Sequence, residues 1–326
     1  MQKEQGLPNS RQGWTRLTSF IEQYSARPIT PGIRALADAL LERYGDAAAA
    51  VLAYGSCFRN RTDEGLADLC VLVDSYRSLP GTVWQQWLYR VLPPTVFYLE
   101  IPHNGRLLRA KYIVISCEDF ERGVSPRRFY SYLWGRFAQP TGVLYVRDEY
   151  AAQRVYTALA QAVVTFVGRV VPILPSTFDA RDLWQQGLRL SYGTELRPER
   201  TDAVARLVDH SFDYYEQVTR IGMECVQFDV RLMEADRTAR YQAAIPVSIR
   251  FIAGLAWRIR KVHGKILNVL RLLKGLFTFK SGRDYILWKI ERHSGMRVDV
   301  PPYYERYPWF ATAMILGRLY RRGAFR

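Results

Sequence analysis

The spacing of hydrophobic positions changes near residue 148. Before that point, short apolar runs that favour strands alternate with stretches whose apolar residues recur every three or four positions, as in helices. The run at 69–73 is apolar and rich in valine, which predicts a strand buried on both faces. Asn104-Gly105 predicts the tight turn of a hairpin. Strands are expected over 47–54, 69–73, 96–101, 107–115 and 143–146, and helices over 15–24, 33–44, 82–91 and 127–137.

After residue 149 strand signals nearly vanish, and apolar residues at helical spacing predict a mostly helical region. The sequence therefore predicts an α+β protein, with a mixed-sheet domain over 1–148, a helical domain over 149–246 and a basic amphipathic region over 247–326. No Pro/Ser-rich linker separates these parts, so we expect them to pack together. The expected helices are 151–170, 180–190, 201–219, 220–236 and 247–280.

Charge changes this picture at the C-terminal end. The formal net charge is +15, and Arg250 to Arg326 hold 17 Lys/Arg against 4 Asp/Glu. Such a tail predicts an anionic partner: nucleic acid, an anionic membrane or a phosphate-rich substrate. Four dispersed cysteines argue against a zinc site and indicate a reducing compartment. No uncharged apolar run reaches 18 residues and no signal sequence is evident, so we expect a protein that does not span a membrane but can lie on one.

The candidate chemistry lies at 51–56 and 67–74. An apolar run ends in Gly55-Ser56, a polar loop follows, and a second apolar run carries Asp68 at its start. This is the layout of a strand, a turn whose backbone approaches phosphate, and a strand with a Mg²⁺ ligand, as nucleotidyltransferases use it. The alternative is an ordinary turn in an α/β domain.

The second metal ligand is less obvious. Nucleotidyltransferases commonly show Asp-x-Asp, but Cys70 occupies the second position here. Asp74 lies about 20 Å further along the strand. Glu100, between two apolar residues on a later strand, is the expected second ligand, with an ion pair to Lys or Arg as its alternative. Asp63 is a weaker candidate.

Five short stretches beyond this turn occur in the order found in one known family. The chain resembles the mitochondrial-type phosphatidate cytidylyltransferases of the translocator-assembly-and-maintenance family, as a divergent bacterial member. The stretches cover roughly residues 50 to 200. They are Tyr54-Gly55-Ser56 with Asp68-Leu69, Val96-Phe97-Tyr98 leading to Lys111-Tyr112-Ile113-Val114-Ile115-Ser116, Tyr132-Leu133-Trp134-Gly135-Arg136-Phe137-Ala138-Gln139-Pro140, Leu174-Pro175-Ser176-Thr177-Phe178 and Leu188-Arg189-Leu190-Ser191-Tyr192-Gly193.

The resemblance implies a nucleotidyltransferase-like fold and Mg²⁺-dependent transfer of CMP from CTP to phosphatidic acid, giving CDP-diacylglycerol and pyrophosphate. It implies that Gly55 and Ser56 contact the CTP phosphates and that Asp68 binds Mg²⁺. Lys111 would neutralise phosphate charge, which makes it catalytic together with Asp68, and Arg136 would lie close to a nucleotide or lipid phosphate.

The chain also departs from that family. Cys57 replaces the second glycine of the turn, and Glu195 stands near the place of an expected Asp. A Trp-His-x-x-Asn stretch expected after the second strand is missing. These departures leave the acceptor open. Tyr192 could stack on a base or lie in the core, and the isolated histidines, His210 among them, are expected to be structural.

The segment 247–280 predicts a membrane contact. Its apolar residues recur at spacings of three and four, while Arg258, Lys261 and Lys265 lie mostly on the other side. This pattern is typical of a helix that lies in a layer of lipid headgroups, with the three cations drawn to anionic lipid. The alternative is a helix that packs on the core and exposes its Lys/Arg face. We expect a peripheral protein on the cytoplasmic face of the bacterial inner membrane.

Two other functions stay open at this stage. One is a nucleotidyltransferase that acts on RNA or another phosphorylated acceptor. The other is a membrane-bound adaptor that kept the fold and lost the chemistry, motivated by Cys70. The tail separates apolar from basic residues instead of interleaving stacking aromatics with cations, so no nucleic-acid partner is expected. The sequence does not indicate an oligomeric state.

Overall fold

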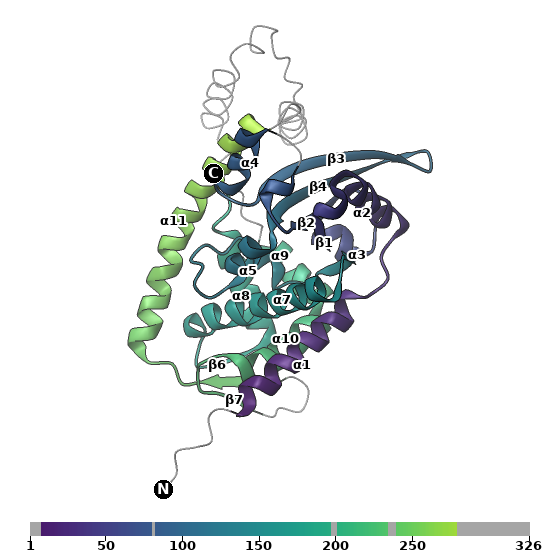
Figure 1. Ribbon diagram of the computed structural model, residues 1–326. Coiled ribbons are helices and arrows are strands. Elements are labelled where there is room, and N and C mark those ends of the chain that lie inside the picture. The colour runs from purple at the N-terminus through teal and green to yellow at the C-terminus, as the bar shows by residue number, and fades with distance from the viewer. Residues whose placement is uncertain (1–7, 80–81, 197–200, 234–238, 279–326) are drawn as a thin grey trace.

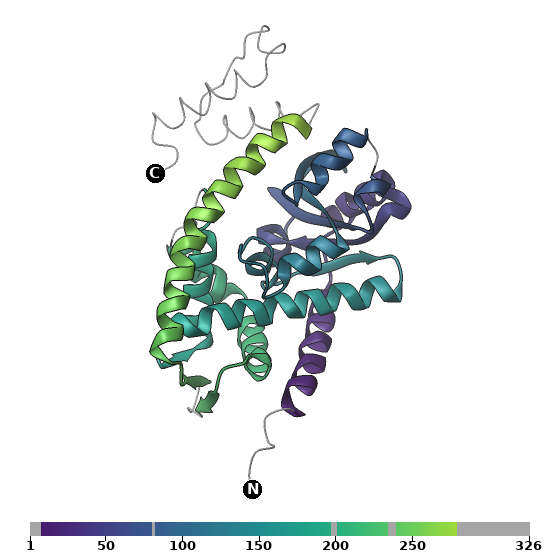
Figure 2. The same cartoon turned by 60° about the vertical axis from the view of Figure 1, so that its left-hand side comes forward.

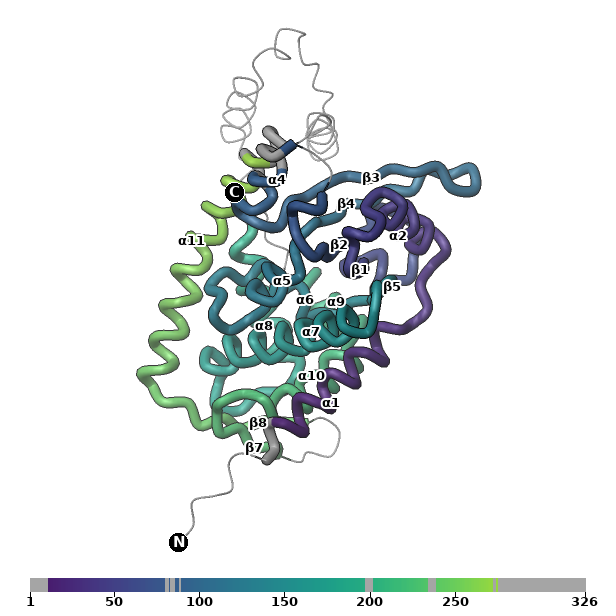
Figure 3. Tube along the Cα trace, viewed as in Figure 1, coloured from purple at the N-terminus to yellow at the C-terminus, as the bar shows by residue number. Residues whose placement is uncertain are grey.

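A five-stranded mixed sheet forms the first part of the protein. The computed structural model describes residues 8–79, 82–196, 201–233 and 239–278 (Figure 1). In the strand order β3-β4-β2-β1-β5, β2 and β4 run parallel and the other neighbours antiparallel. The β3–β4 hairpin extends past the rest of the sheet (Figure 3). The strands are β1 (Ala48–Tyr54), β2 (Leu66–Val73), β3 (Thr95–His103), β4 (Arg106–Ser116) and β5 (Gly142–Val146).

Both faces of the central strands are covered, because alternate side chains of β1 and β2 enter two different cores. Val51 and Val71 face α2 (Pro31–Tyr44), which begins with Pro31 and is capped at its C-terminus by Gly45. Leu52 and Leu72 face the other way, into a larger core shared with the helical part. The other helices before residue 148 are α1 (Pro8–Ser25), α3 (Gly55–Asn60), α4 (Val83–Arg90), α5 (Cys117–Val124) and α6 (Trp134–Phe137).

The larger core continues across residue 148, where the side chain of Asp148 caps the N-terminus of α7 by accepting a hydrogen bond from the Ala151 N–H. This helix runs beneath the sheet (Figure 2) and contacts α1, α5, α6, α8 and α10. Among the described residues, the segment Glu149–Ile173 is apolar and long enough to cross a membrane, but 61% of it is buried inside the protein. The helices of this part are α7 (Glu149–Val170), α8 (Ala180–Tyr192), α9 (Thr201–His210), α10 (Phe212–Gly222) and α11 (Val247–Thr278).

The α+β prediction is confirmed, and three local predictions are wrong. Of the helix expected over 127–137, only α6 forms. The helix expected over 201–219 breaks at Ser211 into α9 and α10. The region 220–236 contains a strand, β7 (Val230–Met233), which joins β6 (Thr177–Asp179) and β8 (Arg240–Ala243) in a small antiparallel sheet. Strands this short leave little periodic signal, since pairing with distant segments stabilises them.

The last described helix, α11, lies along one side of the molecule (Figure 2). Two of its charged side chains, Arg260 and Lys274, are buried against the body of the protein. Arg260 is 1% exposed; its Nε donates to the Phe129 carbonyl (2.6 Å), and its guanidinium lies 4.6 Å from the Trp257 ring centroid. Lys274 is also buried and donates to the Leu92 carbonyl (3.3 Å). Burial, and then the charge of Arg271, lowers the pKa of Lys274 to about 7.

The apolar side of α11 faces outward. Its residues lie three and four positions apart and have exposed fractions between 40% and 63%, so the described part of the chain does not bury them. The helix also packs on the core through Trp257 and exposes Arg258 and Lys261, so the alternative of a core helix describes its inner side but does not account for the exposed apolar residues. We call this surface the outer stripe: Ile252, Leu255, Ile259, Val262, Ile266 and Val269.

Candidate functional site

A cavity of about 550 Å³ lies between the sheet and the helical part. The turn from β1 into α3, the start of β2 and the middle of β4 form one wall. The short helix α6 and the C-terminal end of α8 form a second wall, and α9 forms a third. The predicted residues that line it are Gly55, Ser56, Asp68, Lys111, Arg136, Tyr192 and Glu195.

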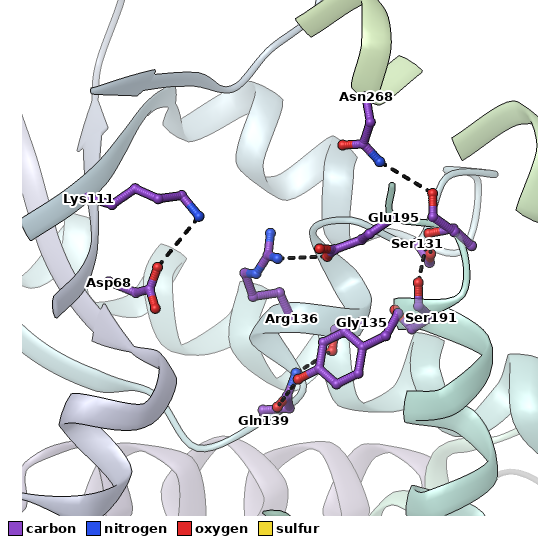
Figure 4. A network of polar contacts seen from close by, with 11 residues as sticks. Asp68, Lys111, Ser131, Gly135, Arg136, Gln139, Ser191, Glu195 and Asn268 are labelled. Atoms are coloured by element: carbon purple, nitrogen blue, oxygen red, sulfur yellow. Dashed lines mark hydrogen bonds and ion pairs between the residues drawn. The ribbon is translucent and has the colours of Figure 1, made fainter. Parts of the chain in front are cut away.

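Asp68 and Lys111 meet in this cavity because they are register partners on the parallel strands β2 and β4. Lys111 Nζ lies 3.7 Å from Asp68 Oδ1, and the two side chains are 28% and 26% exposed (Figure 4). Tyr54 is the register partner of Asp68 on β1. Burial and the Asp68 charge raise the pKa of Tyr54 above its usual value, so it stays neutral. Thus one cation and one carboxylate share a partly solvated position at the sheet.

Gly55 sets how closely the turn approaches Asp68. Its φ of +81° belongs to the left-handed region that glycine favours. A Cβ on Gly55 would lie 2.5 Å from Asp68 Oδ2, so no other residue fits without displacing the carboxylate. Ser56 follows at the exposed start of α3, whose first turn has no side-chain cap. The side chain of the next residue, Cys57, packs in the core beneath.

Arg136 and Glu195 face this pair from the opposite wall. Arg136 Nη2 donates to Glu195 Oε1 at 2.7 Å (Figure 4). The guanidinium lies 4.2 Å from the Tyr132 ring centroid, and its buried Nη1 has no hydrogen-bond partner among the described residues. Glu195 therefore lies in the site, paired with Arg136. Arg136 keeps donor capacity for a further acceptor.

A polar network holds this wall in place. Ser131 Oγ lies 3.1 Å from Thr194 Oγ1, and Thr194 Oγ1 donates to the Ser191 carbonyl at 2.7 Å. Asn268 of α11 donates to the Thr194 carbonyl at 3.3 Å (Figure 4). Helix α11 approaches this closely at Gly264, where a Cβ would lie 2.7 Å from the Thr194 carbonyl oxygen. The last described helix thus touches the residue beside Glu195.

Tyr192 also belongs to this wall. Its hydroxyl donates to Gln139 Oε1 at 3.0 Å, and its half-buried ring borders the cavity. It is therefore neither a fully buried core residue nor a free stacking platform.

Three basic residues in the cavity were not predicted as site residues, and one of them, His210, was expected to be structural. Arg59 comes from α3, and Arg206 and His210 come from α9. His210 Nε2 lies 3.2 Å from the Arg59 carbonyl oxygen, and Arg206 pairs with Asp202 at 3.0 Å. Arg206 and His210 are one helical turn apart, which puts them on one face. The sequence spacing thus indicates that the two side chains lie close together, but it does not indicate that this face of α9 lies opposite the sheet.

The structure separates Glu100 from the cavity, which corrects the prediction of a second metal ligand there. Glu100 lies on β3, two strands away from Asp68, and its Oε1 accepts from Arg109 Nε at 2.8 Å. The register sets Tyr98, not Glu100, level with Lys111 and Asp68. Glu100, on the edge strand β3, instead forms an ion pair with Arg109, which was the alternative expected for it.

Asp63 and Cys70 are structural as well. The Asp63 carboxylate accepts from the Gly32 N–H (3.1 Å) and the Ile33 N–H (3.2 Å), so it caps the N-terminus of α2. Cys70 points into the larger core and is 0% exposed, and burial raises the pKa of its thiol. The second Asp of Asp-x-Asp would therefore not reach the cavity in this protein.

The residues of the cavity can be tested for a metal site. The described residues contain no group of three or more His, Cys, Asp or Glu side chains arranged to hold a metal ion. Mg²⁺ in nucleotide enzymes is commonly held by one or two carboxylates together with substrate phosphates and water. Asp68, whose partly exposed carboxylate faces the cavity, fits that pattern once a polyphosphate supplies the other oxygens.

Comparisons with known proteins add little beyond this geometry. No model of a protein family matches the sequence, and no curated protein matches it. Among solved structures, the chain is similar to a nucleotidyltransferase-like protein from Exiguobacterium sibiricum, with 13% identity over 80% of each chain and a TM-score of 0.25. A similarity with so low a TM-score carries no argument about function.

Proposed function

We propose that this protein is a Mg²⁺-dependent nucleotidyltransferase that transfers CMP from CTP to phosphatidic acid, giving CDP-diacylglycerol and pyrophosphate. The Asp68–Lys111 pair beside the Gly55-Ser56 turn carries this proposal, because it combines a metal-binding carboxylate, a phosphate-binding cation and close backbone approach in one cavity. The cavity volume, about 550 Å³, is in the usual range for small-molecule sites.

The reaction joins two anions, so its main requirement is to reduce their repulsion. An oxygen of the acceptor phosphate bonds to the α-phosphorus of CTP, and the bond from that phosphorus to the bridging oxygen breaks as pyrophosphate leaves. Lys111 and Arg136 approach from opposite walls and stabilise the charge that builds up on the phosphoryl oxygens. Asp68 would hold Mg²⁺, which supplies further positive charge when bound. Glu195 holds the Arg136 guanidinium in position until phosphate competes for it.

The proposal includes a membrane surface as the second partner. The outer stripe presents exposed apolar residues, and Arg258, Lys261 and Lys265 lie along one edge of it. A helix with this arrangement suits the boundary between headgroups and acyl chains, where each cation near an anionic surface contributes about 1 kcal/mol. The apolar stripe supports lipid over RNA, because an RNA-binding face needs exposed cations and stacking aromatics.

Substitution of Asp68 tests the chemistry. Purified wild type and Asp68→Asn are incubated with each nucleoside triphosphate, Mg²⁺ and phosphatidic acid vesicles, and pyrophosphate release is measured. The variant should lose at least 100-fold in turnover, since a neutral amide binds Mg²⁺ far less well than a carboxylate. Glu100→Gln is the matched control and should keep wild-type turnover. If Asp68→Asn keeps more than a tenth of the activity, the assignment is wrong.

Charge reversal tests the membrane contact. The triple change of Arg258, Lys261 and Lys265 to Glu should release the protein from vesicles that contain phosphatidic acid in a flotation assay. Turnover on a soluble short-chain phosphatidic acid should survive, because these side chains lie outside the cavity. If the triple variant floats as wild type does, the proposed contact is wrong. A control with the same charge change reverses the exposed residues Arg11, Arg77 and Arg240.

A further inference from the structure

A second cavity, of about 240 Å³, lies where α11 meets the end of α4, the segment before β3 and the helix α5. It shares no lining residue with the cavity that holds Asp68 and Lys111. Four arginines and one acidic residue line it: Arg90, Arg122, Arg128, Arg271 and Asp119. Such a concentration of guanidinium groups in a small space is unfavourable unless anions balance it.

Arg271 is fixed at this cavity by two aromatic rings. Its guanidinium lies 4.8 Å from the Tyr130 ring centroid and 4.7 Å from the Tyr132 ring centroid, and its Nη2 donates to the Pro93 carbonyl at 2.9 Å. Its Nε and Nη1 are buried and have no hydrogen-bond partner among the described residues. Two buried donors on a charged group are costly to leave unpaired. The side chain is therefore preorganised to donate to a further acceptor.

The one carboxylate of the cavity does not balance these charges. Asp119 Oδ1 accepts from Arg122 at 3.0 Å, and Asp119 Oδ2 accepts from the Tyr76 hydroxyl at 2.7 Å. Within the described part of the chain, Arg90, Arg128 and Arg271 have no carboxylate within ion-pair distance. The cavity thus has an uncompensated positive charge, from the half-buried Arg271 and the exposed Arg90 and Arg128.

We propose that this cavity binds a phosphomonoester, the terminal phosphate of a small metabolite or of a lipid headgroup. A phosphate dianion presents several strong acceptor oxygens in a compact group, and planar guanidinium groups bind it better than any other side chain does. A single carboxylate carries half the charge and two oxygens, too few for three arginines. The proposal does not depend on the nucleotidyltransferase assignment.

The position of the site also suggests what its occupant does. Arg271 belongs to α11, whereas Tyr132, which it contacts, also lies 4.2 Å from the guanidinium of Arg136 in the first cavity. A phosphate bound between Arg271, Arg90 and Arg128 would tie α11 to α4 and to the segment that precedes α6. The ligand would thereby stabilise the docking of α11 beside the wall that carries Arg136.

The test measures binding to the wild type and to Arg90→Gln/Arg128→Gln, which removes two exposed cations and leaves the buried Arg271 contacts intact. One arm titrates sn-glycerol 3-phosphate by calorimetry. The other measures flotation on phosphatidylcholine vesicles with and without phosphatidic acid. The matched control is Arg77→Gln/Arg127→Gln, because both residues are exposed and neither lines a cavity described above. Lys111→Ala, tested in the same way, separates this site from the first cavity.

The proposal predicts at least tenfold weaker binding by Arg90→Gln/Arg128→Gln in one of the two arms, while the control binds as wild type does and Lys111→Ala does not reproduce the loss. A loss in the calorimetric arm identifies a soluble phosphomonoester, and a loss confined to the vesicle arm identifies the lipid headgroup. Binding by Arg90→Gln/Arg128→Gln that equals the control in both arms would overturn the proposal. So would binding that Lys111→Ala abolishes, since the phosphate would then occupy the first cavity.

Discussion

Gly55→Ala is the substitution whose effect can be worked out most directly from the structure. Alanine at a φ of +81° costs about 1–2 kcal/mol, because its Cβ crowds the following carbonyl oxygen. The new Cβ would also lie 2.5 Å from Asp68 Oδ2 and 3.1 Å from Asp68 Cβ. Moving that side chain off its rotamer adds about 0.5–1.5 kcal/mol, and weakening its ion pair with Lys111 adds up to about 1 kcal/mol. We expect a loss of about 2–4 kcal/mol in the free energy of unfolding.

Gly105→Ala separates the two contributions. Gly105 has a φ of +71° in the hairpin turn, and a Cβ there would meet nothing within 4 Å. It should therefore cost only the backbone contribution, about 1–2 kcal/mol. Both changes lower the conformational entropy of the unfolded chain by replacing a glycine, so this contribution cancels in the comparison. Urea denaturation at equilibrium gives the two values, with an unchanged slope as the sign that the denatured states are alike.

A double-mutant cycle with Asp68→Ala then tests the cause. In that background the carboxylate is gone and only the 3.1 Å contact with the Cβ of residue 68 remains, so the excess cost of Gly55→Ala over Gly105→Ala should shrink markedly. If Gly55→Ala costs no more than Gly105→Ala in the wild type, the close approach of the turn to Asp68 is not a constraint. An extra cost that is undiminished without the Asp68 carboxylate would contradict the reasoning equally, because it would have another source.

Three further predictions concern buried positions. The pKa of Lys274 is about 7 in the folded protein and near 10.5 when exposed, so the protein takes up a proton on unfolding between these pH values. The free energy of unfolding should therefore rise with pH from about 7 to 10, by up to about 1.4 kcal/mol per pH unit. Lys274→Met should flatten that slope in urea denaturation measured at several pH values. Gly264→Ala should destabilise the protein by about 2 kcal/mol or more, since its Cβ would lie 2.7 Å from Thr194. Gly254→Ala on the same helix has open space and should stabilise the protein by about 0.5–1 kcal/mol. Thermal denaturation measures both changes. Cys70→Asp, which restores Asp-x-Asp, should lower the free energy of unfolding by about 3 kcal/mol or more in urea denaturation, because a charge would be buried at a position that is 0% exposed. Cys70→Ala should lower it much less. Equal losses for the two variants would contradict the burial of Cys70.

The sequence predicted the sheet and the long helices because their periodicities are strong and local. The run at 69–73 could only be a strand covered on both faces, and β2 is one. The small sheet left no such signal, since β6 and β8 are three and four residues long and pair across more than 50 positions of sequence. Helix period alone also did not locate the break at Ser211, where the chain turns between two amphipathic segments.

The site divides in the same way. Gly55 and Ser56 directly follow β1, and Asp68 lies near the start of its antiparallel neighbour β2, so a local pattern brings them together. The prediction for Glu100 was wrong because strand register decides which residue of β3 lies level with Lys111. That residue is Tyr98, and Glu100, two positions further along β3, pairs with Arg109 instead. Arg206 and His210 come from a helix that the sheet meets only through tertiary packing. For α11 the amphipathic pattern was right, but no pattern tells which side the body of the protein covers.

The inward face of α11 has a mechanical consequence. This helix has 32 residues and is therefore about 48 Å long. It is held at separate points along its length by Trp257, Arg260, Asn268 and Arg271, each of which donates a hydrogen bond to a backbone carbonyl. Directional bonds to fixed carbonyls resist rolling and sliding in a way that apolar contacts do not. The outer stripe is thus fixed relative to the body of the protein. Any surface that binds the stripe therefore also sets the orientation of the nearby cavity and the side from which an acceptor reaches it.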